Sequence, residues 1–139
     1  MTLNEKERRD IVALLRKEIP SIQAVYLFGS QADKSANAAS DVDIAFLTNE
    51  TVSNVRRWEI AQKLAVLCLR DVDLIDLKTA NTVLRFYVVA MGERLYGEGY
   101  EVDLFETVSY SAYLRFKEER KAIVDAIVDD KRVFGAKYA

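Results

Sequence analysis

Three short apolar segments are the feature of this sequence that most limits its fold. They read AVYLF at 24–28, DVDIAFL at 41–47 and DVDLIDL at 71–77, and their lengths and composition predict three strands. Helical patterns of apolar residues precede, separate and follow them. Because helices and strands alternate along the chain, we expect an α/β or α+β fold with a small mixed β-sheet flanked by helices.

The helical patterns have recognisable starts and stops. Thr2 and Glu5 have the spacing of a capping box, and the first helix is expected to end before Pro20, the only proline. Thr79 is the expected cap of a helix that Gly92 ends. The first helix, a helix at 52–69 and a helical region at 101–130 in one or two segments are expected to bury apolar stripes: Ile11, Leu14, Leu15 and Ile19; Trp58, Ala61, Leu64, Ala65 and Cys68; Phe105, Val108, Ala112, Phe116, Ile123 and Ile127.

Composition narrows the class of protein. The chain has 139 residues, the size of one domain; half of them are hydrophobic and 30% are charged, as in soluble globular proteins. Lys and Arg total 20 against 22 Asp and Glu, so we expect no direct nucleic-acid binding through bulk positive charge. The sequence has no apolar stretch long enough to span a bilayer, and we expect no membrane partner.

The cysteine and histidine counts narrow the chemistry. A single cysteine, Cys68, excludes an internal disulfide and indicates a reducing, cytoplasmic environment. The sequence contains no histidine, which excludes Ser-His-Asp and Cys-His catalysis and disfavours a catalytic zinc site. Any acid–base or metal chemistry in this chain must therefore depend on carboxylates.

Aspartates lie at the start of two predicted strands. Asp41 and Asp43 alternate along one strand, so they point to the same face, roughly 6–7 Å apart. Such a pair can bracket divalent ions, and hard oxygen ligands suit Mg²⁺ or Mn²⁺. If the third strand lies beside the second, Asp73 completes a three-carboxylate cluster. Asp71 has the same parity at the strand edge, whereas Asp76 has the opposite parity. The alternative is a solvated strand end without a ligand.

A Gly29–Ser30 pair follows the first strand, with ten residues between Ser30 and Asp41. A glycine here lets the backbone approach a ligand closely, and the turn directs N–H groups and the serine hydroxyl outward, where they can hold a phosphate. A simple turn with a serine N-cap is the alternative. Combined with the aspartates, the pair is suited to a nucleoside triphosphate. The serine end would bind its outer phosphates while the carboxylates hold metal at its α-phosphate.

Together these residues resemble a known superfamily. Gly29–Ser30, ten residues, Asp41-x-Asp43 and the later strand aspartate Asp73 are similar to the pattern of the DNA polymerase β-like nucleotidyltransferases. The short length is similar to the minimal nucleotidyltransferases (MNT) of that superfamily, which are encoded beside HEPN-domain partners.

The resemblance runs from about Ala24 to Tyr96 and departs from the family pattern in one loop. Many relatives carry an arginine after the serine and a glycine further along, where this chain has Gln31 and Lys34–Ser35. The resemblance implies a single minimal nucleotidyltransferase domain, with a polymerase β-like catalytic core at about 22–97 and C-terminal helices at about 100–134.

The resemblance also implies a reaction, the transfer of AMP from ATP to a hydroxyl with release of pyrophosphate. Asp41 and Asp43 would bind both metal ions, Mg²⁺ or Mn²⁺, and Asp73 would hold the second ion and could take the hydroxyl proton. Gly29 and Ser30 would bind the nucleotide. The implied partner is a HEPN ribonuclease toxin in a stable hetero-oligomer, and the implied role is that of an antitoxin that attaches AMP to a toxin tyrosine.

Two other functions stay open. One is a small-molecule adenylyltransferase of the aminoglycoside type, against which the missing acceptor-binding domain counts. The other is an antitoxin that acts by binding alone, against which the intact aspartates count.

Lys34 and Lys78 lie near the expected site and could contact phosphate, and the dense tyrosines at 96–113 could serve an interface. No sequence pattern specifies the base of the nucleotide.

Overall fold

The structure is a computed structural model that describes residues 3–29 and 41–138, with side chains up to residue 130. It has the mixed α/β class that the sequence predicts. In the described part of the chain, no helix has the length and apolar character needed to cross a membrane. The elements in chain order are α1 (Glu5–Glu18), β1 (Ile22–Phe28), β2 (Val42–Thr48), α3 (Asn54–Cys68), β3 (Val72–Asp76), α4 (Thr82–Met91), β4 (Glu93–Tyr96) and α5 (Tyr100–Tyr138).

The four strands form one mixed sheet in the order β3-β2-β1-β4. β1 pairs antiparallel with both β2 and β4, whereas β2 pairs parallel with β3. A parallel pair needs a crossover connection, which α3 provides between β2 and β3. The register places Asp43 between Phe28 of β1 and Asp73 of β3. Asp43 therefore lies on an inner strand with a neighbour on each side.

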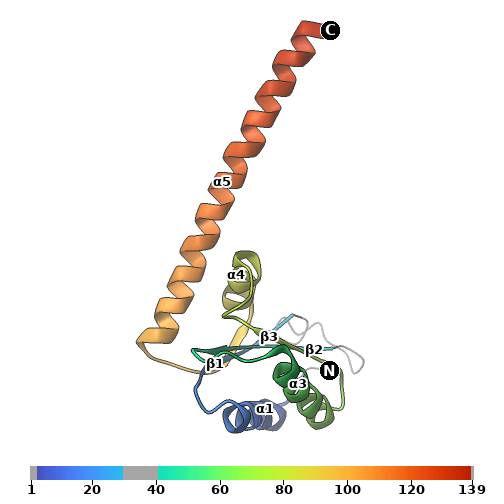
Figure 1. Ribbon diagram of the computed structural model, residues 1–139, viewed down its shortest axis with the longest axis vertical. Helices are drawn as coiled ribbons and strands as arrows, with labels where there is room; N and C mark the ends of the chain where they lie inside the picture. The colour runs from blue at the N-terminus through green and yellow to red at the C-terminus, as the bar shows by residue number, and fades with distance from the viewer. Residues whose placement is uncertain (1–2, 30–40, 139) are drawn as a thin grey trace.

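Helices cover both faces of the sheet (Figure 1). α1 and α3 lie on one face, where Leu15 packs in the same apolar cluster as Ile44. α4 and the first turns of α5 lie on the other face, where Val88 packs in a second cluster with Ala45. Because successive strand side chains point to opposite faces, Asp43 belongs to the face that α4 covers.

Two helix caps differ from the predicted ones. The cap of α1 is Asn4, two residues after the predicted Thr2, and its side chain accepts the N–H of Glu7 at 2.8 Å. The cap of α4 is Asn81 in place of the predicted Thr79. Asparagine and threonine are both strong N-cap residues, so composition alone did not decide between positions two residues apart.

α5 is one continuous helix of 39 residues, and most of it projects from the body of the molecule (Figure 1). The prediction that its apolar stripe is buried was largely wrong, since only Phe105 and Ala112 of that stripe are partly buried. Trp58 of α3, also predicted to point inward, is 63% exposed. Helical spacing shows that a helix has an apolar face but not that the same chain covers it. The exposed members of the α5 stripe are Val108, Phe116, Ile123 and Ile127.

Candidate active site

Two of the predicted site residues, Asp43 and Asp73, face each other across the parallel strands β2 and β3. Paired residues of neighbouring strands point to the same face, and the strands are about 4.8 Å apart. Asp43 is half-buried and Asp73 is exposed. Asp41 directly precedes β2 and is also exposed. The fold thus brings the three predicted aspartates to one end of two adjacent strands.

The charges of these aspartates act on one another. Burial raises the pKa of the Asp43 carboxyl above its ordinary value, and the negative charges of Asp73 and Asp41 raise it further. Both effects disfavour the ionised form of Asp43, and a nearby cation offsets both. The geometry agrees with these causes, because Asp73 is the strand partner of Asp43 and Asp41 lies two residues before it. Perturbed carboxylates of this kind are typical of functional sites.

The aspartates do not form a ready-made metal cage. Within residues 3–29 and 41–138, no group of three or more histidine, cysteine, aspartate or glutamate side chains is arranged to hold a metal ion. Asp43 and Asp73 nevertheless supply paired anionic oxygens, which are the ligands that Mg²⁺ and Mn²⁺ prefer. The repulsion at Asp43 is also the kind that a divalent cation relieves. The donor set therefore fits such an ion.

Gly29 is held directly against Asp43. Its φ angle is +69°, in the left-handed region that only glycine adopts readily. A Cβ atom at this position would overlap the Asp43 carboxylate, with Oδ2 as the nearest atom. The turn after β1 therefore needs glycine both for its conformation and for the close approach. Ser30, the other predicted nucleotide-binding residue, and Lys34 lie outside the described residues.

The remaining acidic candidates and Lys78 have other surroundings. Asp71 is exposed, and its carbonyl oxygen accepts the Val42 N–H at 2.9 Å at the start of the parallel ladder. Asp76 is buried, and its carboxylate accepts the backbone N–H of Lys78 at 3.0 Å in the turn after β3. Lys78 donates from Nζ to the carbonyl of Asn49 at 3.1 Å. Asn49 follows the far end of β2, so Lys78 lies roughly 20 Å from the carboxylates.

An aromatic contact that the sequence pattern does not predict borders the carboxylates. Phe28, the strand partner of Asp43, meets Tyr87 of α4 edge to face, with ring centroids 6.2 Å apart at 84°. Phe28 is buried, whereas Tyr87 is 42% exposed. Val83 and Met91 lie one turn before and after Tyr87 and are exposed as well. We call Val83, Tyr87 and Met91 the α4 ridge; its sequence signal is their i, i+4, i+8 spacing.

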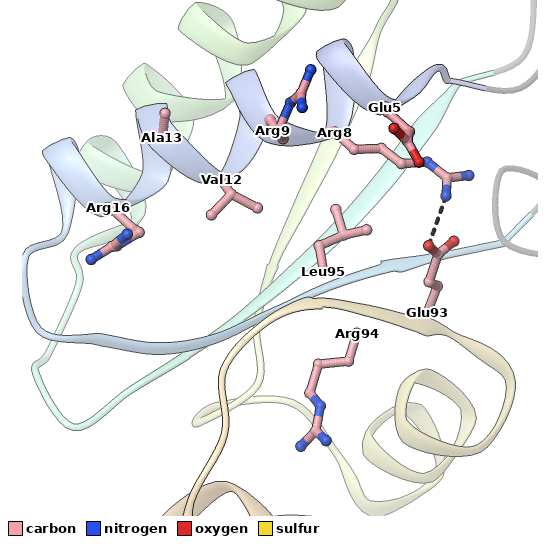
Figure 2. Close-up of a pocket in the computed structure, with 9 residues that line it drawn as sticks. All are labelled: Glu5, Arg8, Arg9, Val12, Ala13, Arg16, Glu93, Arg94 and Leu95. Carbon is pink, nitrogen blue, oxygen red and sulfur yellow. Dashed lines mark hydrogen bonds and ion pairs between the residues drawn. The ribbon is translucent and has the colours of Figure 1, made fainter.

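A hollow of about 510 Å³ lies between α1 and β4 (Figure 2). An ion pair joins α1 to β4 beside it, where Nη1 of Arg8 lies 2.7 Å from Oε1 of Glu93, and Val12 and Leu95 are among its lining residues. β1 lies between β4 and the strand of Asp43, and α1 packs on the face of the sheet opposite to the Asp43 side chain. It is therefore not the candidate active site.

The repulsion at Asp43 leads to a stability prediction. We expect Asp43→Asn to melt at a higher temperature than the wild type at neutral pH in metal-free buffer. The raised pKa means that the folded state holds the Asp43 proton more tightly than the unfolded state, so the wild type loses stability as pH rises through that pKa. Asparagine does not ionise and avoids this loss.

The measurement is the melting temperature of both proteins between acidic and neutral pH. The advantage of Asp43→Asn should shrink as pH falls to the ordinary aspartate range, and added Mg²⁺ should narrow it at neutral pH. Asp125→Asn, at an exposed position on α5, is the matched control and should show no such trend. A wild type that is the more stable protein at neutral pH without metal would contradict the inferred repulsion.

Comparison with known proteins agrees with this geometry. Residues 9–101 match the family Polymerase beta, Nucleotidyltransferase. The chain is 44% identical over 126 residues to the protein adenylyltransferase MntA of Shewanella oneidensis, a match that covers 91% of this chain and 88% of that protein.

Two solved complexes are similar in structure. The crystal structure of a toxin–antitoxin with AMP-PNP matches with a TM-score of 0.79 at 44% identity, covering 91% of this chain and 99% of that chain. The structure of a tri-AMPylated Shewanella oneidensis HEPN toxin in complex with MNT antitoxin matches with a TM-score of 0.77 at 40% identity and the same coverage. The resemblance inferred from the sequence pattern is confirmed, and this chain belongs to the polymerase β family of nucleotidyltransferases.

Proposed function

We propose that this protein is an antitoxin adenylyltransferase, which transfers AMP from ATP to a tyrosine hydroxyl of a HEPN ribonuclease toxin and so neutralises it. The observation that carries the proposal is the pairing of Asp43 with Asp73 on adjacent strands, next to Gly29, in a chain 44% identical to a protein adenylyltransferase. Support for the substrates comes from the related complexes, one with AMP-PNP and one with a tri-AMPylated HEPN toxin.

The residues of this chain supply position and charge for the reaction. Asp41, Asp43 and Asp73 would hold Mg²⁺ or Mn²⁺, which when bound screens the phosphate charge and lowers the pKa of the attacking hydroxyl. Asp73, exposed at the sheet edge, is the carboxylate placed to accept the proton of that hydroxyl. Gly29 and Ser30 bind the triphosphate, since the absent Cβ at Gly29 leaves the backbone beside the central carboxylate.

The proposal includes a stable complex with the toxin. Exposed apolar residues on α5 favour a protein partner over a small-molecule acceptor, because monomeric proteins rarely expose contiguous apolar surface without a binding role. The cytoplasmic location indicated by the single Cys68 stays a prediction. So does the division into a catalytic core at about 22–97 and a helical part at about 100–134.

The test mixes the purified chain with the HEPN-domain protein encoded beside it, Mg²⁺ and each nucleoside triphosphate in turn. The intact mass of the HEPN protein should rise by one or more AMP units with ATP and should not change when metal is omitted. Replacing the accepting tyrosine with phenylalanine should remove the adduct. An unchanged mass with every nucleotide would contradict the proposed activity.

A further inference from the structure

The α4 ridge lies on the same face of the sheet as the Asp43 side chain. Val88 of α4 packs in the apolar cluster of that face together with Phe28. The three ridge residues are not part of this cluster, although Tyr87 touches its Phe28, and they are 42–64% exposed. Large apolar side chains thus remain in solvent next to a carboxylate centre, although their helix is anchored in the core.

Tyr87 is two contacts from the reaction centre. Phe28 and Asp43 are directly opposite residues of the antiparallel strands β1 and β2, so their Cα atoms are about 5 Å apart and their side chains share a face. The ring of Tyr87 is centred 6.2 Å from that of Phe28. Only the Phe28 side chain therefore separates the Tyr87 ring from Asp43, so the ring is near enough to meet the base of a nucleotide whose α-phosphate lies at the aspartates.

The position of the Tyr87 ring is set by rigid elements. α4 ends at Gly92, where a Cβ atom would lie 3.1 Å from the Leu27 carbonyl oxygen and 3.4 Å from the Phe28 Cβ. The end of the helix is thus packed tightly on β1. The edge-to-face contact with the buried Phe28 then fixes one side of the Tyr87 ring, while the rest of the ring stays accessible. A ring held in this way binds without first being ordered.

We propose that Tyr87 is the platform on which the nucleobase of ATP stacks, with Val83 and Met91 as its apolar borders. The assignment rests on the proposed function and adds the base-binding residue to it. Stacking on an aromatic ring accepts any base, because every base has a π-face. The lack of a base-specific pattern in the sequence agrees with a platform of this kind. Tyr87 therefore contributes affinity for the nucleotide and little discrimination between ATP and GTP.

The test compares Tyr87→Ala with Tyr87→Phe. In titration calorimetry with AMP-PNP and Mg²⁺, Tyr87→Ala should bind roughly ten-fold or more weakly than the wild type, and Tyr87→Phe should bind nearly as well, because it keeps the ring. In AMP transfer, the KM for ATP should rise for Tyr87→Ala. The KM for the acceptor protein and kcat at saturating ATP should stay close to wild-type values. The same loss should appear with GTP analogues.

Tyr100→Ala is the matched control, since Tyr100 is a 78% exposed tyrosine at the start of α5, and it should bind AMP-PNP normally. Melting temperatures establish that each variant is folded. Wild-type affinity in Tyr87→Ala would overturn the platform. A rise in the KM for the acceptor protein with an unchanged KM for ATP would overturn it too, because the ridge would then contact the acceptor. Weaker AMP-PNP binding in Tyr87→Ala would support the platform even if the wild type failed to modify any HEPN protein, which would contradict only the proposed function.

Discussion

The double variant Asp41→Ala, Asp43→Ala is expected to lose AMP transfer by roughly a thousand-fold or more. Asp43 lies between two strands with Asp73 opposite, and Asp41 adds its charge at the mouth of β2. Without these two carboxylates, only Asp73 is left to bind the cation that offsets the phosphate charge. The measurement is the rate at which AMP appears on the HEPN protein by intact mass, at saturating ATP and Mg²⁺.

The same variants separate catalysis from binding. Asp71→Ala is the matched control, because its side chain is exposed and its carbonyl oxygen makes the ladder hydrogen bond. It should retain near-normal transfer. In cells that express the toxin, the double variant should protect growth less well than the wild type and the control. Equal protection by the double variant would mean that binding alone neutralises the toxin.

Gly29→Ala should combine a loss of activity with a loss of stability. At a φ of +69°, a non-glycine residue costs about 1 kcal/mol, and the added Cβ must also displace the Asp43 carboxylate. We expect a total loss of about 2 kcal/mol, since forcing an atom into an occupied site costs about 1–3 kcal/mol. We also expect transfer to fall as steeply as in the aspartate variant, because Asp43 is moved. Urea denaturation and the transfer assay measure the two effects.

Gly99 is a matched control that separates the clash with the Asp43 carboxylate from the backbone strain of a positive φ angle. Gly99 has a φ of +100°, and a Cβ atom there would meet nothing within 4 Å among the described residues, so Gly99→Ala carries the backbone strain without the clash. It should be destabilised less than Gly29→Ala and stay active. Adding Asp43→Ala to Gly29→Ala should recover stability but not activity, because it removes the atom that the methyl group meets. Equal stability of the two glycine variants, with transfer retained, would contradict a role for the close approach.

The centre of the site was predictable because it depends on strand periodicity. Alternation along a strand predicts Asp41 and Asp43 on one face, with Asp73 beside them on a parallel neighbour. The observed register pairs Asp43 with Asp73, and Asp41 directly precedes β2. The need for glycine at position 29 was predictable as a turn with a close approach. The sequence did not predict that Gly29 lies against Asp43, because this contact depends on how β1 pairs with β2.

Features that depend on distant contacts were not predictable. Phe28 and Tyr87 are far apart in the sequence, and only the packing of α4 on β1 brings their rings together. Trp58 occupies a helical position compatible with burial, yet it lies on the solvent side of α3. Lys78 follows an aspartate-rich strand but leaves the sheet at the end opposite to the carboxylates. In each case the local secondary structure was predicted correctly, but tertiary contacts determined where the side chain lies.

The long projecting part of α5 links the stability of this helix to the binding of a partner. From residue 116 to 138 the helix extends for about 33 Å at 1.5 Å per residue, away from the sheet (Figure 1). In proteins, most of the stability of a helix comes from tertiary packing of its apolar face rather than from intrinsic propensity. A partner protein that buries Phe116, Ile123 and Ile127 therefore also stabilises the helix on which they lie. The fraction of α5 bound to a partner and the helix content of α5 then rise and fall together. Warming that frays the outer turns of α5 also weakens the affinity for the partner.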